Sequence, residues 1–246
     1  MARLLKDGGL FEQLRRAATG ELGAAATVDV AEVYLAGGDY AKALDMLEPV
    51  VDNNVFQQSR CDELRMQIYQ HTGQDADAHA LAWAIFYRCR SMVGLENLLK
   101  VIGESRRDEI VTQEVERIQA SQVFSTADAD FMIQTGHVDE CARYIERHAD
   151  QINGENYYWL PRLADTLQSH GHLLAATIVF RALLVSLLER GHTKAYRHGV
   201  RYLRQLEIMA PGIVDWGGML DHVAFRQYLQ SRHGRKRSFW KQVQEV

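Results

Sequence analysis

The sequence predicts an all-α fold, a right-handed solenoid of about five helix pairs closed by two C-terminal helices, and three observations carry this prediction. A short turn pattern, Gly-x-large-x-x-small, recurs along the chain. Apolar residues between its copies follow a helical period. Strand signals are nearly absent, because no sustained alternation and no hairpin dipeptide between apolar runs is found.

The repeat is defined by five glycines at intervals of 35, 30, 33 and 35 residues, namely Gly38, Gly73, Gly103, Gly136 and Gly171. The residues four before them are large and mostly apolar: Tyr34, Tyr69, Leu99, Met132 and Leu167. The residues five after them are mostly small: Ala43, Ala78, Asp108, Cys141 and Ala176. A period near 34 residues with this turn is typical of tetratricopeptide-like helix pairs. The alternative is that these glycines are ordinary helix C-caps in an irregular helical protein.

The elements follow from this register. A short helix is expected within residues 1–20, and Thr27 is expected to cap the next helix. Pro49 is expected to end or bend one helix, and Asn53-Asn54 to form a turn. A longer turn is expected at residues 104–107, where the column of small residues shifts by two. The predicted pairs are 28–37 with 39–52, 56–72 with 75–90, 93–102 with 106–120, 126–135 with 137–151, and 156–170 with 172–190.

The pattern changes after Arg190. A helix from Thr193 to Met209 should stop at the Ala210-Pro211-Gly212 sequence, and a last helix should run from Met219 to His233. End units of solenoids are atypical because they cover an otherwise exposed apolar face. We therefore divide the chain into a repeat region, residues 1–190, and basic capping helices, residues 191–246, continuous with the same solenoid.

Composition favours a folded chain. Hydrophobic residues make up 47% of its 246 residues and there are three prolines. The N-terminus lacks the apolar core of a signal peptide. The most apolar stretch, Leu173 to Leu188, contains Arg181 and is too short to span a membrane. The three cysteines are widely spaced, and we expect them to be reduced thiols. Cys141 is expected to be a small core residue. These features predict a cytoplasmic protein without membrane association.

A polar column marks candidate groove residues. The residue six before each repeat glycine is polar in every copy, and in a tetratricopeptide-like stack this position faces the concave groove. Such a groove can hold a peptide or helix of a partner, and its acidic members favour a basic one. The alternative is the solvated stripe of any amphipathic helix. The candidates, with neighbouring positions added, are Glu32, Gln67, Asn97, Asp130, Tyr158, Arg162 and Asp165.

Charge is unevenly distributed. Residues 190–241 contain 11 Lys or Arg and 3 Asp or Glu, a net charge of +8, whereas the whole chain carries −4, so the remainder carries −12. Basic residues interleaved with aromatic ones can bind nucleic acid, or dock on acidic surface of a partner or a second copy. The alternative is a solvated face whose long side chains cover apolar surface. The basic-face candidates are Lys194, Arg197, Arg201, Arg204, Arg232, Arg235, Lys236, Arg237 and Trp240.

Catalytic and metal-binding motifs are missing from the sequence. The GxSxG, HExxH, P-loop and GxGxxG patterns are absent. The His170-Gly171-His172 sequence has no further ligand at a fixed spacing, and zinc sites usually need three or four. We therefore expect a non-catalytic protein with no cofactor and no metal.

The last residues resemble a known family. The stretch from Tyr228 to Trp240 is similar to the ending of a bacterial family of uncharacterised tetratricopeptide-like helical proteins, and to the ending of the helical region of bacterial SWIM zinc-finger proteins. The zinc motif of the latter, Cys-x-Cys followed by Cys-x-His, is absent, so its zinc and DNA roles do not carry over. The resemblance implies an all-helical bacterial protein of unknown function. It rests on Tyr228, Leu229, His233, Lys236, Arg237 and Phe239.

Three functions are compatible with these patterns. The first is a scaffold or adaptor that docks a protein or peptide partner in the concave groove. The second is a nucleic-acid-associated protein that uses the basic C-terminal face. The third is a salt-dependent homodimer in which the basic end of one copy docks on the acidic part of another. The sequence favours the first.

Overall fold

The computed structural model describes residues 2–48 and 55–245, and this part of the chain is helical without any β-strand. The all-α class is thereby confirmed. By internal contacts the chain forms two units, Met1–Arg106 and Arg107–Val246, which are treated separately below. The division predicted at residue 190 falls inside the second unit, where α11 and α12 pack together.

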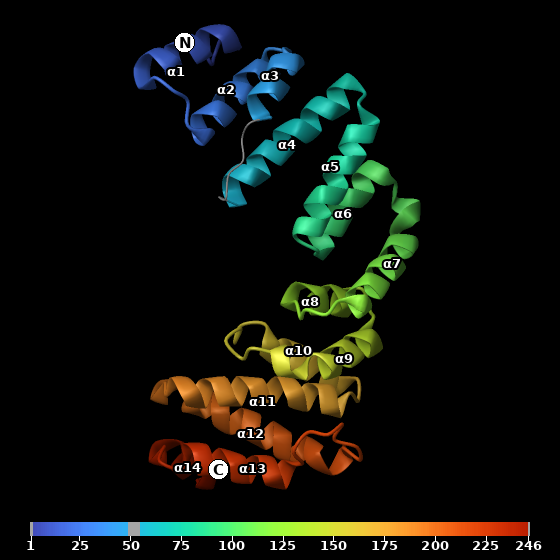
Figure 1. Cartoon of the computed structure of the whole chain (residues 1–246), viewed down its shortest axis with the longest axis vertical. Helices are drawn as coiled ribbons and strands as arrows, with labels where there is room; N and C mark the ends of the chain where they lie inside the picture. The colour runs from blue at the N-terminus through green and yellow to red at the C-terminus, as the bar shows by residue number, and fades with distance from the viewer. Residues whose placement is uncertain (1, 49–54, 246) are drawn as a thin grey trace. The chain divides into compact units, whose positions relative to one another are not determined.

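The first unit contains six α-helices among its described residues and ends in a short 3-10 helix (Figure 1). Each of α2 to α6 has a counterpart among the predicted helices, with ends displaced by a few residues. The elements are α1 (Gly8–Thr19), α2 (Ala24–Ala36), α3 (Tyr40–Leu47), α4 (Val55–Thr72), α5 (Asp75–Arg88), α6 (Met92–Ile102) and η1 (Glu104–Arg106).

The second unit contains the remaining helices. The longer turn expected at residues 104–107 is confirmed, since η1 precedes the first helix of this unit. The elements are α7 (Arg107–Ala120), α8 (Thr126–Gln134), α9 (Val138–Arg147), η2 (Ala149–Gln151), α10 (Leu160–Ser169), α11 (Leu173–Arg190), η3 (Thr193–Ala195), α12 (Tyr196–Met209), η4 (Ala210–Gly212), α13 (His222–His233) and α14 (Arg237–Gln244).

The recurring glycines share one backbone conformation. All five have positive φ, and the three clearest copies, Gly38, Gly136 and Gly171, have φ of 83°, 83° and 84°. After each of these three glycines, the next N–H donates to the carbonyl four residues before the glycine. This bond satisfies a carbonyl that the ending helix leaves without a partner. The column of glycines therefore marks a real, repeated turn.

Side-chain caps start several helices. A carboxylate or hydroxyl at the N-cap accepts a hydrogen bond from a backbone N–H one turn on, which replaces a partner the helix cannot supply. The capping residues are Asp7, Asp39, Ser91, Ser125 and Asp221.

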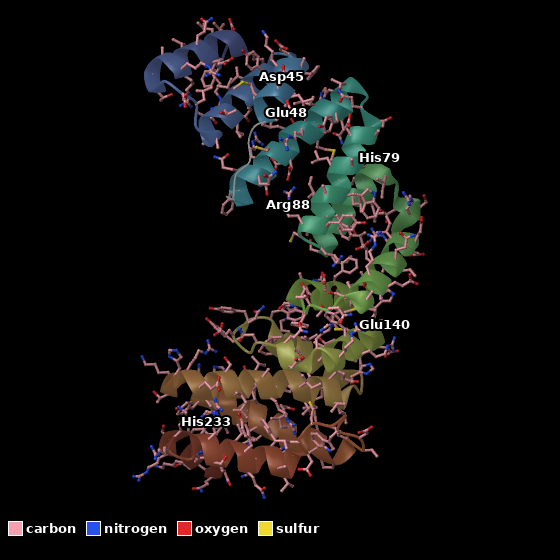
Figure 2. All side chains as sticks on the ribbon, in the orientation of Figure 1. Asp45, Glu48, His79, Arg88, Glu140 and His233 are labelled. Carbon is pink, nitrogen blue, oxygen red and sulfur yellow. The ribbon has the colours of Figure 1, made fainter. Side chains whose placement is uncertain are left out.

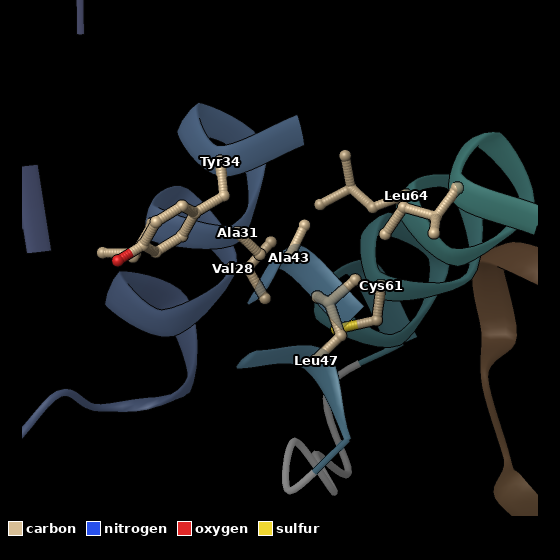
Figure 3. Close-up of a cluster of buried hydrophobic side chains, with 9 residues drawn as sticks. Val28, Ala31, Tyr34, Ala43, Leu47, Cys61 and Leu64 are labelled. Carbon is tan, nitrogen blue, oxygen red and sulfur yellow. The ribbon is translucent and has the colours of Figure 1, made fainter. Parts of the chain in front are cut away.

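The core of the first unit joins three helices. Val28 and Ala31 of α2 lie beside Ala43 and Leu47 of α3, and α4 adds Cys61 and Leu64 to the cluster (Figure 3). The ring of Tyr34 points away from α3, toward α1, where its hydroxyl donates to Glu12. The small side chains are fully buried, so α2 and α3 approach closely. Because close packing is sensitive to volume, the small residues of the repeat column fix this approach.

The core of the second unit is built around α11, which lies between α10 and α12 (Figure 1). Most residues of α11 are buried, including Phe180, Leu184 and Leu188. This explains why its sequence is apolar on nearly every side. No described helix is long and apolar enough to cross a membrane.

The one charged residue of this apolar stretch is held by aromatic rings. The guanidinium of Arg181 lies 4.8 Å from the ring centroid of Trp216 and 4.3 Å from that of Phe225. Its Nη1 donates to the carbonyl of Leu220 at 2.7 Å. Burial lowers the pKa of Arg181 to about 10. The residue thus ties the segment after η4 to α11.

Some expectations differ from the structure. Thr27 is not an N-cap: α2 begins at Ala24, and the Thr27 hydroxyl donates to the carbonyl of Gly23. The run Ala24-Ala25-Ala26 has the highest helix propensity, so the helix extends back to Gly23. The final residues form a further helix, α14, which was not predicted because the basic residues there hide its apolar positions. The expectations for Pro49 and Asn53-Asn54 lie outside the described residues.

The repeat turn makes a direct prediction. A Cβ added at Gly171 would meet no atom within 4 Å, so Gly171→Ala changes only backbone strain. We expect a loss of about 1–2 kcal/mol in the free energy of unfolding, measured by urea denaturation. Gly171→Asn should lose clearly less, because asparagine tolerates positive φ. Equal losses for both variants would contradict a turn controlled by φ.

Candidate functional site

A groove runs over the helices of the first unit. It has a volume of about 560 Å³ and is lined by α4, α5 and α6 together with Cys89 and nearby residues. Both α4 and α6 pack on α5, which supplies the floor between them. The volume lies within the range of ligand-binding clefts in proteins. The apolar lining consists of Met66, Ala82, Ile85, Leu98 and Val101.

A buried carboxylate forms part of the groove wall. The side chain of Asp62 on α4 is only 5% exposed, and its Oδ2 accepts from Arg88 Nη1 at 2.6 Å. Gln58 donates to the other oxygen at 3.1 Å. Arg88 reaches it from the last turn of α5, where Figure 2 labels it. A buried charge needs such pairing, so this interaction connects α4 and α5 beside the groove.

The other charged side chains that line the groove are exposed, and each has a polar partner. Glu63 pairs with Arg60 one turn before it, at 2.9 Å. Lys100 Nζ donates to the Asn97 side-chain oxygen at 3.1 Å. The lining therefore contains two acids, Asp62 and Glu63, and two bases, Arg88 and Lys100, so its formal charge sums to zero.

The groove combines apolar surface with side-chain amides. Its floor is apolar, and three amide side chains, Gln58, Gln70 and Asn97, stand along it. A side-chain amide offers both donors and an acceptor, as a peptide backbone does. The arrangement suits an uncharged, partly apolar chain more than a charged small molecule.

The predicted polar column is only partly brought to this groove. Among its members in the first unit, Asn97 lines the groove and Gln67 does not, although Gln67 is exposed on α4. Glu32 is half-buried and forms ion pairs with Arg3, at 2.6 Å, and with Arg60. Its carboxylate therefore joins α2 to the start of the chain and to α4.

The column members of the second unit have different surroundings. Asp130 accepts from the indole Nε1 of Trp159 at 2.7 Å, which holds the start of α10 against α8. Asp165, Arg162 and Tyr158 are exposed, and the Tyr158 ring lies 4.4 Å from the ring of Tyr157. A ligand-binding role for these residues stays a prediction.

The basic residues of α12 form an exposed face. Arg197, Arg201 and Arg204 point to solvent, whereas Val200 and Leu203 are buried. The Arg201 guanidinium lies 5.6 Å from the Tyr202 ring. Lys194, in η3, stands apart from this face because it lines a separate pocket of the second unit.

The basic C-terminal run surrounds aromatic residues that belong to the core. Phe239 is fully buried and packs edge-on against Tyr196 and Trp240. The Trp240 indole donates to the carbonyl of His233 at 3.0 Å. These rings pack against one another, and a role of the basic C-terminal face in binding nucleic acid stays a prediction. Around them, Arg232 pairs with Glu189 at 2.9 Å, Arg235 and Arg237 are exposed, and Lys236 is half-buried.

The histidines that raised the question of metal have other contacts. His172 Nε2 lies 2.8 Å from Asp139 Oδ1, and His170 Nδ1 lies 2.9 Å from the carbonyl of Thr166. In the described ranges, no three His, Cys, Asp or Glu side chains are grouped so as to hold a metal. Cys141 is a fully buried core residue, as expected, and burial raises the pKa of its thiol to about 12.

The sequence reasoning missed the buried pair of Asp62 and Arg88. One signal was present: Asp62 lies between Cys61 and Leu64, which are both core residues on α4. A carboxylate on the apolar face of a helix requires a cation, and Arg88 is 26 residues away in sequence. Their proximity follows from the hairpin of α4 and α5, which periodicity predicts only coarsely.

Comparison with known families gives one match. Residues 14–242 match the family described as a family of unknown function (DUF6880), and because the match covers most of the chain, the protein belongs to this family. An uncharacterised family was expected from the C-terminal ending, whereas bacterial origin and similarity to SWIM proteins stay predictions. Curated proteins and solved structures gave no significant match.

The C-terminal signature has a structural basis. Three of its six residues, Leu229, His233 and Phe239, are buried, and Tyr228 stacks on Phe225 at a centroid distance of 6.2 Å. The backbone N–H of Phe239 donates to the carbonyl of Lys236. These residues pack α13 and α14 within the second unit. This structural role is enough to explain why these residue types occur in the C-terminal ending.

Two members of the polar column should respond differently to mutation. Asp130→Ala removes the charged acceptor of the half-buried Trp159 indole N–H, so we expect a loss of about 1–3 kcal/mol in unfolding free energy. Asp165→Ala, at an exposed position, should stay within about 0.5 kcal/mol of the parent protein. Urea denaturation measures both. Equal effects would show that the Trp159 hydrogen bond does not distinguish the two sites.

Acid should destabilise the second unit through its buried histidines. Burial, together with Lys236 and Arg232, lowers the pKa of His233, and burial also lowers the pKa of His222. The unfolded chain therefore binds protons that the folded chain does not, and the free energy of unfolding falls as pH drops below about 6.5.

The slope of the unfolding free energy against pH cannot exceed about 1.4 kcal/mol per pH unit for each extra proton that the unfolded chain binds. Thermal unfolding between pH 8 and pH 5, compared with His233→Leu, measures it. The variant should show a smaller fall. A parallel fall in both proteins would remove His233 as a cause.

Proposed function

We propose that this protein is a non-catalytic adaptor, a tetratricopeptide-like helical repeat that docks a protein partner in the groove of α4, α5 and α6. One observation carries the proposal: the groove of about 560 Å³ combines an apolar floor with amide side chains and a lining of zero formal charge. An extended peptide segment has the same combination of apolar side chains and backbone hydrogen-bonding groups.

The charge balance of the groove lining indicates which kind of ligand the groove accepts. Asp62 and Arg88 neutralise one another at 2.6 Å, so neither needs a charged partner from outside. A strongly charged ligand would have to displace such pairs and would leave a buried carboxylate uncompensated. The occupant is therefore an extended segment of low net charge whose apolar side chains enter the groove over Ile85 and Met66.

The rigidity of the walls supports this use. The Asp62–Arg88 ion pair links α4 to α5, and Leu98 and Ala82 are buried beneath the surface of the groove. Binding then orders the peptide but not the receptor, which limits the entropy lost on association. Met66, half-buried and flexible, can adapt to different apolar side chains.

A peptide library displayed on phage tests the proposal with the full-length chain. Selected peptides should be rich in apolar residues and low in net charge. Met66→Glu places a carboxylate in the apolar lining, so we expect it to weaken a selected synthetic peptide by about tenfold or more in fluorescence anisotropy.

Gln67→Glu is the matched control, because it puts the same carboxylate on the next residue of α4, outside the groove. It should bind the peptide as the parent protein does. Circular dichroism confirms that both variants fold. A peptide whose affinity is unchanged by Met66→Glu, or equally reduced by Gln67→Glu, would contradict docking in this groove.

A further inference from the structure

The second unit contains a pocket of different chemistry, with a volume of about 400 Å³. It lies where the end of α11, η3, the first turn of α12 and the loop around Gly154 come together. None of its lining residues belongs to the groove of the first unit. Its volume falls within the range of small-molecule sites.

The lining concentrates positive charge. Arg190, Lys194, His192 and His198 all line it, and all four are exposed at its mouth. Among the lining residues, which all lie in the described part of the chain, none is acidic. Asp165 lies outside the lining and acts electrostatically on Tyr202. Two permanent cations with two imidazoles beside them match an anion of about two charges.

The floor of the pocket is apolar and aromatic. Leu183 and Leu187 of α11 are buried, as is Tyr202 of α12, which packs on Phe180. At the mouth, the ring of Tyr157 is half-exposed and lies 5.6 Å from the Arg190 guanidinium. A ligand here meets cations on one side and flat apolar surface on the other.

Two glycines produce this geometry. A Cβ at Gly154 would lie 2.1 Å from the carbonyl oxygen of Ala182, so only glycine lets the loop close onto α11 and carry Tyr157 to Arg190. Gly191 ends α11 with a φ of 68°, which turns the chain so that His192 and Lys194 stand beside Arg190. The pocket is formed by backbone turns and needs no ligand to create it.

We propose that this pocket binds a small organic phosphate whose phosphate group is joined to a flat ring, as in a nucleoside monophosphate. The phosphate lies between Arg190 and Lys194, which supply charge-assisted hydrogen bonds. The ring rests on the apolar floor and against Tyr157. The site shares no lining residue with the peptide groove and gives the protein a second binding function.

A single compact group of cations at one pocket favours a small ligand over a polymer. A nucleic acid strand requires phosphate contacts spread along a surface, with accessible rings between them. The aromatic residues of the basic C-terminal run, Phe239 and Trp240, are engaged in packing. The pocket, by contrast, brings cations and apolar surface together at one point.

Isothermal titration calorimetry of the full-length protein tests this, with adenosine monophosphate, adenosine, inorganic phosphate and a single-stranded oligonucleotide as probes. Adenosine monophosphate should bind saturably with one site per chain, and adenosine and inorganic phosphate each at least about tenfold more weakly. Arg190→Gln and Lys194→Gln should each weaken adenosine monophosphate by about tenfold.

Arg235→Gln and Arg237→Gln are the matched controls, because they remove exposed charge from the same unit outside the lining. They should leave the affinity unchanged, and so should Met66→Glu, which separates this site from the groove. Four outcomes would overturn the proposal. These are no saturable binding at millimolar probe, equal binding of adenosine, an equal effect of the control variants, and binding of a single-stranded oligonucleotide alone.

Discussion

The carbonyl groups at the end of a helix need partners, and the way this chain supplies them determines its architecture. At Gly38, Gly136 and Gly171 the backbone enters positive φ, and the next N–H turns back to a carbonyl of the ending helix. Only glycine adopts this conformation at little cost. Because the reversal follows within two residues, the next helix must pack beside the one before, and the small side chain five residues on lets it do so.

Repeated hairpins leave hollows wherever neighbouring helices diverge, and the side chains there decide their chemistry. In the first unit, the ion pair of Asp62 and Arg88 joins α4 to α5. The two charges neutralise one another, and the groove beside them has an apolar floor and no net formal charge. In the second unit, Arg190 and Lys194 follow the end of α11 without an acid among the lining residues. The groove and the pocket therefore differ in charge, and we propose a peptide as the ligand of the first and an organic phosphate as the ligand of the second.

Much of this fold is readable from the sequence, because the turn requires glycine and leaves a visible column. Helix positions, the longer turn before Arg107 and the core role of Cys141 follow from local rules. The candidate sites were harder to predict from the sequence than the fold. A polar residue in a column looks the same whether it accepts from a tryptophan, as Asp130 does, or lines a groove, as Asn97 does. The difference depends on contacts between residues distant in sequence, which periodicity does not encode.

We propose that the two units contain separate binding sites, one neutral and one basic. Methyl NMR spectra of the full-length protein, titrated once with a selected apolar peptide and once with adenosine monophosphate, test it most directly. The account predicts that the peptide shifts the methyl signals of Met66 and Ile85, and that the nucleotide shifts those of Leu183 and Leu187. Shifts of the same methyl groups by both ligands, or none near these residues, would contradict it.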